Sequence, residues 1–142
     1  ALMQHEGITH HGRVGHAELH KALAQSDVWS YPTDFQEISC ISGMKAQAYG
    51  AIPVVTNFAA LKETVRYGEK VAVDITSEEG QAEYKEKLIK MLKDDTTREA
   101  LRLEMMTNAK EDFSWKNIAK TWDELFKSRL PKGRVFQKAV EK

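Results

Sequence analysis

Short apolar runs alternate along the chain with segments whose apolar residues recur every three to four positions. Four runs predict β-strands, over residues 8–14, 28–31, 52–55 and 71–75. Helical spacing predicts helices over residues 15–25, 38–49, 61–67, 78–93, from 96 or 97 to about 111, and from 115 to Pro131. Because strands and helices alternate, we predict an α/β fold. It has a partial Rossmann-like parallel sheet of about four strands flanked by helices, with a helical C-terminus.

The fold prediction depends most on the segment from residue 31 to residue 55. Pro32 ends one strand, and the helix over residues 38–49 is followed by Gly50, a residue that tolerates the left-handed conformation at a helix end. The apolar run over residues 52–55 is typical of a parallel strand that is covered on both faces.

The helices carry residues that we expect to face the core, with Trp122 and Phe126 as a core pair. Thr96 or Thr97 can cap the fifth helix, and Ser114 can cap the last. The residues expected to face inward are Leu19, Ala22, Leu23, Ile41, Met44, Ala48, Ala82, Leu88, Ile89, Leu92, Leu101, Met105, Ala109, Ile118, Trp122, Leu125 and Phe126. Residues 1–130 are thus predicted to form one domain, and residues 131–142 a tail.

Composition narrows the possible partners. The 142 residues include 21 basic and 21 acidic side chains, so nothing in the charge indicates a nucleic-acid partner. The single cysteine, Cys40, excludes an internal disulfide and is typical of a cytoplasmic protein. No apolar run is long enough for a transmembrane segment. Because the chain begins without Met and inside an element, we expect a fragment of a longer protein.

The predicted ligand side lies where the parallel strands end. The loop over residues 33–37 lies there, and the helix N-terminus behind it offers free backbone N–H groups to an anion such as a diphosphate. The residues at this helix start are Ser39, Cys40, Ile41 and Ser42. Glu37 and Lys45 would lie about 12 Å apart if both were helical, a distance that one ligand could span.

The same segment resembles the C-terminal nucleotide-binding domain of GT-B-fold glycosyltransferases, specifically family 4, a group 1-like family. The family has Pro-Ser or Pro-Thr after a strand, a Glu, a second Glu eight residues later, Ala-x-Ala-x-Gly and x-Pro-Val-Val. Lys45 stands where the family has its second Glu. The matching residues are Pro32-Thr33, Glu37, Ala46-Gln47-Ala48-Tyr49-Gly50 and Ile52-Pro53-Val54-Val55, followed by the weaker element Ala59-Ala60-Leu61-Lys62-Glu63-Thr64-Val65.

The resemblance implies retaining glycosyl transfer from a nucleotide-diphosphate sugar, of hexosyltransferase type. Glu37 would face the donor sugar, and the helix start at Ser39 to Ser42 would face the diphosphate. Lys45 would lie on the ribose side, and Arg13 and Val14 near the base. No metal or other cofactor is implied. The N-terminal domain and two strands would belong to the rest of the protein, so we expect this fragment alone to be inactive, with an exposed sheet edge that could form a homodimer.

Residues 8–14 would correspond to the strand whose neighbour is absent. We therefore expect disorder, repacking beside the next strand, or pairing with another chain for this segment.

Alternatives remain open for each of these residues. Glu37 could be a carboxylate stabilised by the helix dipole without a ligand, and Lys45 could be a surface cation or a partner of Glu37. Cys40 fits a small buried filler better than a nucleophile. His16 and His20, one helical turn apart, fit a solvated surface better than a metal site.

For the whole chain, the alternatives are a non-catalytic scaffold or regulatory module that has lost donor binding, and a receiver-like domain. The receiver-like fold is disfavoured because no predicted strand ends in an acidic cluster.

Overall fold

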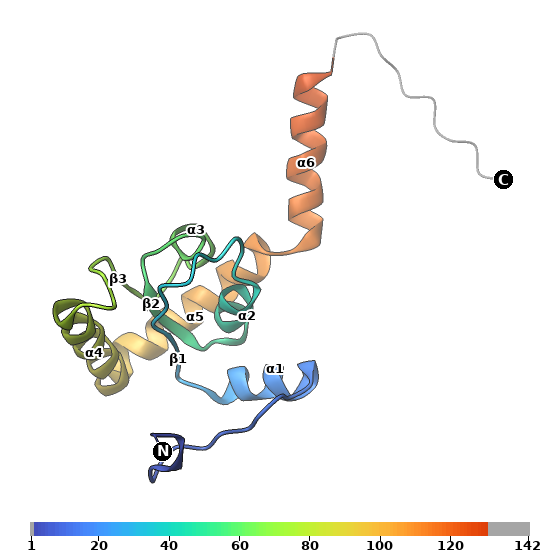
Figure 1. The fold of residues 1–142 in the computed structure, drawn as a ribbon. Coiled ribbons are helices and arrows are strands. Elements are labelled where there is room, and N and C mark those ends of the chain that lie inside the picture. Colours follow the sequence, from blue (N-terminus) through green and yellow to red (C-terminus); the bar gives the residue numbers. More distant parts are fainter. Residues whose placement is uncertain (1, 131–142) are drawn as a thin grey trace. The chain divides into compact units, whose positions relative to one another are not determined.

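The computed structural model describes residues 2–130 of the chain. The chain divides into two compact units, Ala1–Ala109 and Lys110–Lys142, which are described separately. The elements in chain order are a 3-10 helix η1 (Leu2–Gln4), α1 (His16–Gln25), β1 (Val28–Tyr31), α2 (Ile41–Tyr49), β2 (Ile52–Thr56), α3 (Leu61–Thr64), β3 (Glu69–Val71), α4 (Glu78–Lys93), α5 (Asp95–Asp112) and α6 (Trp115–Arg129) (Figure 1).

The first unit is built on a parallel sheet with the strand order β1-β2-β3. Val28 of β1 is in register with Ile52 of β2, and Val54 of β2 is in register with Glu69 of β3. Every residue of the central strand β2 is buried. The predicted α/β class with a parallel sheet, flanking helices and a helical C-terminus is confirmed, with three strands in the described part of the chain rather than about four.

The strand predicted over residues 8–14 is wrong, because this segment is irregular and joins no sheet. Ile8 is 48% exposed, and His10 and His11 are exposed. A segment with so little apolar burial does not offset the entropy of ordering it as a strand. The strand predicted over residues 71–75 is also displaced, because pairing with β2 ends at Val71 and Asp74 then forms a turn with Thr76.

Alternate residues of β2 point to opposite faces of the sheet and fill two core clusters. On one face lie Ile52, Val54, Val71, Tyr84, Met91 and Met105, the last three of them from α4 and α5. On the other lie Cys40, Val55, Leu61 and Val65. A third cluster of Leu23, Ala46 and Ala51 packs α1 against α2. Fully burying one such large aliphatic side chain contributes about 1.5–3 kcal/mol.

Helix faces were predicted well for α5 and poorly for α2 and α4. Met105 and Ala109 of α5 are fully buried, as predicted. In α2, however, Ile41 is 63% exposed, and the buried residues are Gly43, Ala46 and Gln47. In α4 the residues Ala82, Ile89 and Leu92 are exposed, and the buried ones are Gly80, Tyr84 and Met91. In α1, Leu23 is buried as predicted, but Ala22, which was also predicted to face inward, is exposed.

Gln47 faces the core because the fold satisfies its whole amide. Its Nε2 donates to the carbonyls of Gly43 at 2.9 Å and Thr64 at 2.8 Å, and its Oε1 accepts from the N–H of Arg66 at 2.8 Å and of Tyr67 at 3.3 Å. A buried polar group with partners on all sides carries little desolvation cost. This amide therefore joins α2 to the chain that follows α3.

Tyr84 of α4 makes a similar buried contact with the sheet. Its hydroxyl donates to the Val54 carbonyl at 2.7 Å and lies 2.7 Å from Ser30 Oγ. Burial raises the pKa of Tyr84 above 10.

We expect Tyr84→Phe to lower the free energy of unfolding at pH 7 by about 1–2 kcal/mol, because the Val54 carbonyl loses its donor. Since the folded pKa is raised, the unfolded chain releases this proton first. The stability is thus complete below about pH 10 and is lost as the pH rises through the raised pKa. Urea unfolding at pH 7 and above pH 10 should show a weaker alkaline decline in Tyr84→Phe than in the parent, and an unchanged decline would contradict this. Tyr49→Phe is the control, because no hydrogen bond of its hydroxyl is seen within residues 2–130.

The helix ends follow local chemistry. Gly50 ends α2 in the left-handed conformation at φ +93°, as predicted. The cap predicted for α5 is wrong, because Asp94 rather than Thr96 or Thr97 accepts the free N–H. Asp94 accepts from the backbone N–H of Thr97 at 3.0 Å and from its hydroxyl at 2.7 Å, contacts that lower the pKa of Asp94. Aspartate is a strong capping residue.

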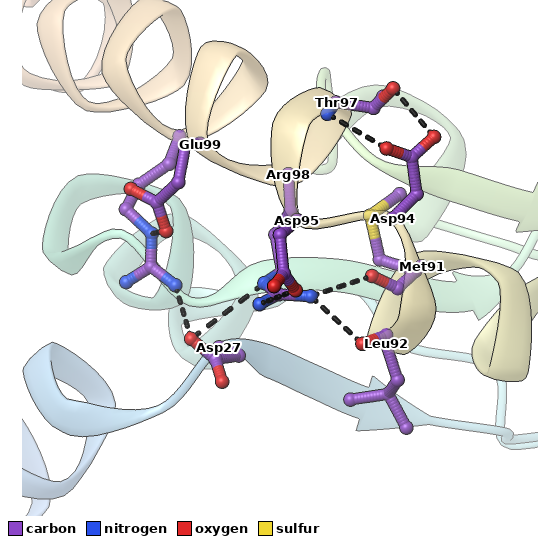
Figure 2. A network of polar contacts seen from close by, with 9 residues as sticks. Asp27, Met91, Leu92, Asp94, Asp95, Thr97, Arg98 and Glu99 are labelled. Atoms are coloured by element: carbon purple, nitrogen blue, oxygen red, sulfur yellow. Dashed lines mark hydrogen bonds and ion pairs between the residues drawn. The ribbon is translucent and has the colours of Figure 1, made fainter.

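A buried guanidinium joins α4, α5 and the start of β1 (Figure 2). Arg98 donates to the carbonyls of Met91 at 3.2 Å and Leu92 at 2.9 Å, and to Asp95 at 2.6 Å. Its Nε also lies 3.8 Å from Asp27. Asp27 in turn accepts a hydrogen bond from Arg102 at 2.7 Å. The free carbonyls at the end of α4 are thus satisfied by a cation.

In the second unit, α6 begins as predicted and packs differently. Ser114 is the cap, because its hydroxyl accepts from the Asn117 N–H at 3.2 Å. Trp122 and Phe126 contact each other edge to face at 5.9 Å between ring centres. The prediction of a core pair is wrong, because Trp122 is 60% exposed and Phe126 is 56% exposed. The tail predicted over residues 131–142 lies outside the described residues.

Candidate functional site

Loops that follow β1, β2 and β3 meet at the carboxyl edge of the sheet, which is where open parallel sheets bind ligands. A pocket of about 480 Å³ lies there. It is lined by Thr33, Asp34, Thr56, Asn57, Phe58, Val71, Ala72, Val73, Asp74, Ile75 and Thr76. None of the residues predicted from the sequence as donor-binding is in this lining, so the edge carries two adjacent features, the pocket and the start of α2.

Glu37 lies in the loop after β1, and Tyr31 holds its carboxylate. Tyr31 Oη donates to Glu37 Oε1 at 2.9 Å. This hydrogen bond is the main reason why the pKa of Tyr31 is raised, with a smaller effect of burial. The Tyr31 ring stacks on Trp29 at 5.2 Å between centres. The backbone also fixes the loop, because Ala60 N–H donates to the Glu37 carbonyl at 3.2 Å. Glu37 is therefore half-buried and oriented from β1.

The start of α2 lies later than predicted. The helix begins at Ile41 with Cys40 as its cap residue, and no side chain makes a capping hydrogen bond there. Ser39 and Ser42 make no capping hydrogen bond to this first turn. Ser39, Ile41 and Ser42 are exposed, and no side-chain capping hydrogen bond is made to the first N–H groups of the helix. Such N–H groups and the helix dipole favour an anion.

Cys40 is 4% exposed and belongs to a core cluster. Burial is the largest cause that raises the pKa of its thiol. A thiol that resists ionisation is a poor nucleophile, which agrees with the predicted filler role.

Lys45 of α2 contacts α1. Its Nζ lies 3.4 Å from His16 Nδ1. The alternative in which Lys45 pairs with Glu37 is wrong, because Glu37 precedes the helix and no ion pair between them occurs within residues 2–130. Arg13 is exposed and Val14 half-buried in the segment before α1. Lys45 thus contacts His16 of α1, whereas Glu37 is held by Tyr31 of β1.

The histidines of α1 form ring contacts. His16 and His20 lie 6.1 Å apart between ring centres, and His20 stacks on Tyr49 at 4.8 Å. Within the part of the chain that the structure describes, no group of three or more histidine, cysteine, aspartate or glutamate residues is arranged to hold a metal ion.

Comparison with known families decides the wider assignment. A family model described as glycosyl transferases group 1 matches residues 1–112. The chain belongs to this family. Its domain is therefore one of glycosyl transfer, and the resemblance found in the sequence is confirmed at this level; the narrower assignment to family 4 stays a prediction. No curated protein and no solved structure matches the chain.

One further observation bears on the group 1 domain. Among the described residues, no helix is both long and apolar enough to cross a bilayer.

The pocket residues Asp34, Phe58 and Asp74 were not predicted from the sequence as site residues. The available signal was that each follows closely on a strand or strand end, where parallel sheets place their ligands.

Proposed function

We propose that this chain supplies the donor half-site of a retaining glycosyltransferase that uses a nucleotide-diphosphate sugar. The observation that carries the proposal is the position of Glu37, held by Tyr31 in the loop that leads into the uncapped start of α2. Family membership supports the reaction class. One carboxylate and one set of free N–H groups are thereby supplied by the same short segment.

Each feature has a separate chemical role in this proposal. The first N–H groups of α2, behind Ser39 and Ser42, would stabilise the negative charge that develops on the leaving diphosphate. The Glu37 carboxylate would accept hydrogen bonds from hydroxyls of the donor sugar and fix its orientation. As the resemblance to family 4 implies, the proposed site would use no metal ion.

The proposal also covers partners. The acceptor would bind to an N-terminal domain of the same protein, so this chain alone would show no turnover. The outer edge of β1, which pairs with no strand in the described part of the chain, would pair with that protein's own sheet or with a second copy. The single cysteine supports a cytoplasmic protein.

Glu37→Gln tests the proposed sugar contact. We expect the affinity for the nucleotide-diphosphate sugar to fall about tenfold, the loss of roughly one charge-assisted hydrogen bond. The affinity for the nucleotide diphosphate alone should stay within about twofold, because Glu37 contacts the sugar and not the phosphates. Isothermal titration of both ligands measures the two effects. Glu86→Gln, an exposed carboxylate on α4, is the control. Equal losses for both ligands, or no loss, would argue against the assignment.

A non-catalytic module is the second candidate, and the contact between Lys45 and His16 favours it. A lysine offers donors and no acceptor, so it does not accept hydrogen bonds from ribose hydroxyls. Under the transferase proposal, Lys45→Glu restores an acceptor and should tighten nucleotide binding about tenfold. Under the module alternative, titration should find no gain from this substitution. Lys45→Gln is the matched control, because it removes the charge without adding a carboxylate.

A further inference from the structure

The orientation of the Glu37 side chain depends on a single neighbour. Tyr31 Oη donates to Glu37 Oε1 at 2.9 Å, and the Glu37 side chain makes no other hydrogen bond or ion pair within residues 2–130. The residues on both sides of it in the sequence, Gln36 and Ile38, are exposed. The second carboxylate oxygen, Oε2, is therefore left available, and its direction is set through the contact of Oε1.

The backbone of this loop is fixed by its own hydrogen bonds. The Phe35 N–H donates to Thr33 Oγ1 at 3.0 Å, and the Glu37 N–H donates to the Phe35 carbonyl at 2.9 Å. The Glu37 carbonyl accepts from the Ala60 N–H at 3.2 Å. The freedom that remains to Glu37 is rotation of its side chain, and a glutamate has much rotamer freedom to lose. The hydrogen bond from Tyr31 restricts this rotation.

Tyr31 can hold the carboxylate because the sheet holds the Tyr31 ring. β1 places Tyr31 in register with Val55 of the central strand. The ring stacks on that of Trp29 at 5.2 Å between centres, and both rings pack against the core cluster that contains Val55. The hydroxyl therefore reaches Glu37 from a ring that core packing keeps in place.

The direction of this hydrogen bond follows from the chemistry of its two groups. An ionised carboxylate only accepts, so the Tyr31 hydroxyl is the donor. The hydrogen bond to Glu37 is the largest cause that raises the pKa of Tyr31 above 10, so the hydroxyl keeps its proton at neutral pH. The donor is thus present before any ligand binds, and the carboxylate is ordered on folding rather than on binding.

We propose that Tyr31 is a positioning residue of the donor site, whose hydroxyl orients Glu37 Oε2 toward the donor sugar. The inference rests on the proposed donor role of Glu37 and adds to it a residue that does not itself contact the sugar. Because Glu37 contacts the sugar and not the phosphates, Tyr31 affects the affinity for a nucleotide-diphosphate sugar and not that for the nucleotide diphosphate alone. A tyrosine needed only for packing would affect both affinities or neither.

A double-mutant cycle on the 142-residue chain tests this role, with isothermal titration of UDP-glucose, GDP-mannose and ADP-glucose and of UDP, GDP and ADP. Tyr31→Phe keeps the ring and removes the hydroxyl. It should weaken binding of the nucleotide sugar about fivefold, while binding of the nucleotide stays within about twofold. In the Glu37→Ala chain, Tyr31→Phe should change nucleotide-sugar binding by less than about twofold, because no carboxylate is left to orient. Tyr67→Phe is the matched control, since its hydroxyl makes no hydrogen bond in the described part of the chain.

The contact itself is measured without ligand, from the ¹³Cζ shifts of labelled tyrosines as the pH is raised. The Tyr31 signal is identified by its absence in Tyr31→Phe. It should titrate at a lower pH in Glu37→Ala than in the parent, because loss of the hydrogen bond moves the Tyr31 pKa back toward its ordinary value. Titration at the same pH in both chains would overturn the proposal.

Two results of the cycle would also overturn it. These are equal losses of nucleotide sugar and nucleotide in Tyr31→Phe, and an effect of Tyr31→Phe that is the same with and without Glu37. If Glu37→Ala weakens nucleotide-sugar binding and Tyr31→Phe does not, the positioning role fails and the donor proposal stands. If Glu37→Ala changes nothing, or no chain binds a nucleotide sugar, both fail. The amide spectrum shows whether each variant is folded, and a misfolded Tyr31→Phe is replaced by Tyr31→Leu, which also lacks the donor.

Discussion

Gly68→Ala is expected to lower the free energy of unfolding by at least about 3 kcal/mol or to prevent folding. Gly68 has φ +91°, where an L side chain is strained, and a Cβ built there would lie 2.0 Å from the carbonyl oxygen of Pro53. That oxygen belongs to the central strand β2, and the next residue, Glu69, is in register with Val54. Neither backbone can move without breaking the ladder between β2 and β3, so the clash cannot relax locally.

Urea unfolding followed by circular dichroism measures this loss. Gly7→Ala is the matched control, because Gly7 has a similar φ of +84° but nothing within 4 Å of a built Cβ. It isolates the conformational cost, which we expect to be about 1 kcal/mol or less in an irregular segment. If the two variants lost equal stability, the close approach of Gly68 to β2 would be refuted.

Arg98→Met is expected to lower the free energy of unfolding by about 2–4 kcal/mol, the second largest effect among the predicted substitutions. Arg98 is 9% exposed and satisfies the carbonyls of Met91 and Leu92 (Figure 2). Methionine fills much of the volume but leaves both carbonyls without their donor. The carboxylates of Asp27 and Asp95 are 55% and 81% exposed, so water hydrates them when the cation is lost. The carbonyls therefore dominate the loss.

Two variants distinguish this explanation from a simple ion pair, with urea unfolding as the measurement. Arg98→Lys keeps the charge but loses the planar fork, so its loss should be more than half that of Arg98→Met. Arg13→Met, at an exposed arginine, should change stability by less than about 0.5 kcal/mol. A lysine variant as stable as the parent would show that charge alone matters.

The sequence predicted the elements whose signals are local. The apolar run of β2 is a buried central strand, Gly50 ends α2, and Ser114 caps α6. It failed where a polar side chain is buried by long-range partners. From the sequence alone Gln47 is expected on the surface, but in the structure its buried amide binds the Thr64 carbonyl and the Arg66 N–H. Because the prediction used apolar residues alone, it assigned the wrong face of α2 to the core.

The candidate site was predictable only in part for the same reason. The loop carrying Glu37 was placed correctly after β1, because strand ends are local signals. The distance estimated between Glu37 and Lys45 assumed one continuous helix, and the helix begins only at Ile41. The pocket at the carboxyl edge of the sheet is lined by Asp34 and Asp74 from different loops, a proximity that depends on the strand order β1-β2-β3.

The most direct test of the donor proposal is a thermal-melt panel of the 142-residue chain with UDP, GDP, ADP and their sugar conjugates, repeated on Glu37→Ala. A ligand that binds the folded state and is present at a hundred times its dissociation constant stabilises it by about 2.7 kcal/mol, which shifts a melt measurably. The proposal predicts that one nucleotide sugar raises the melting temperature more than its parent nucleotide does, and that Glu37→Ala removes the difference. The absence of a shift with every nucleotide sugar would contradict it.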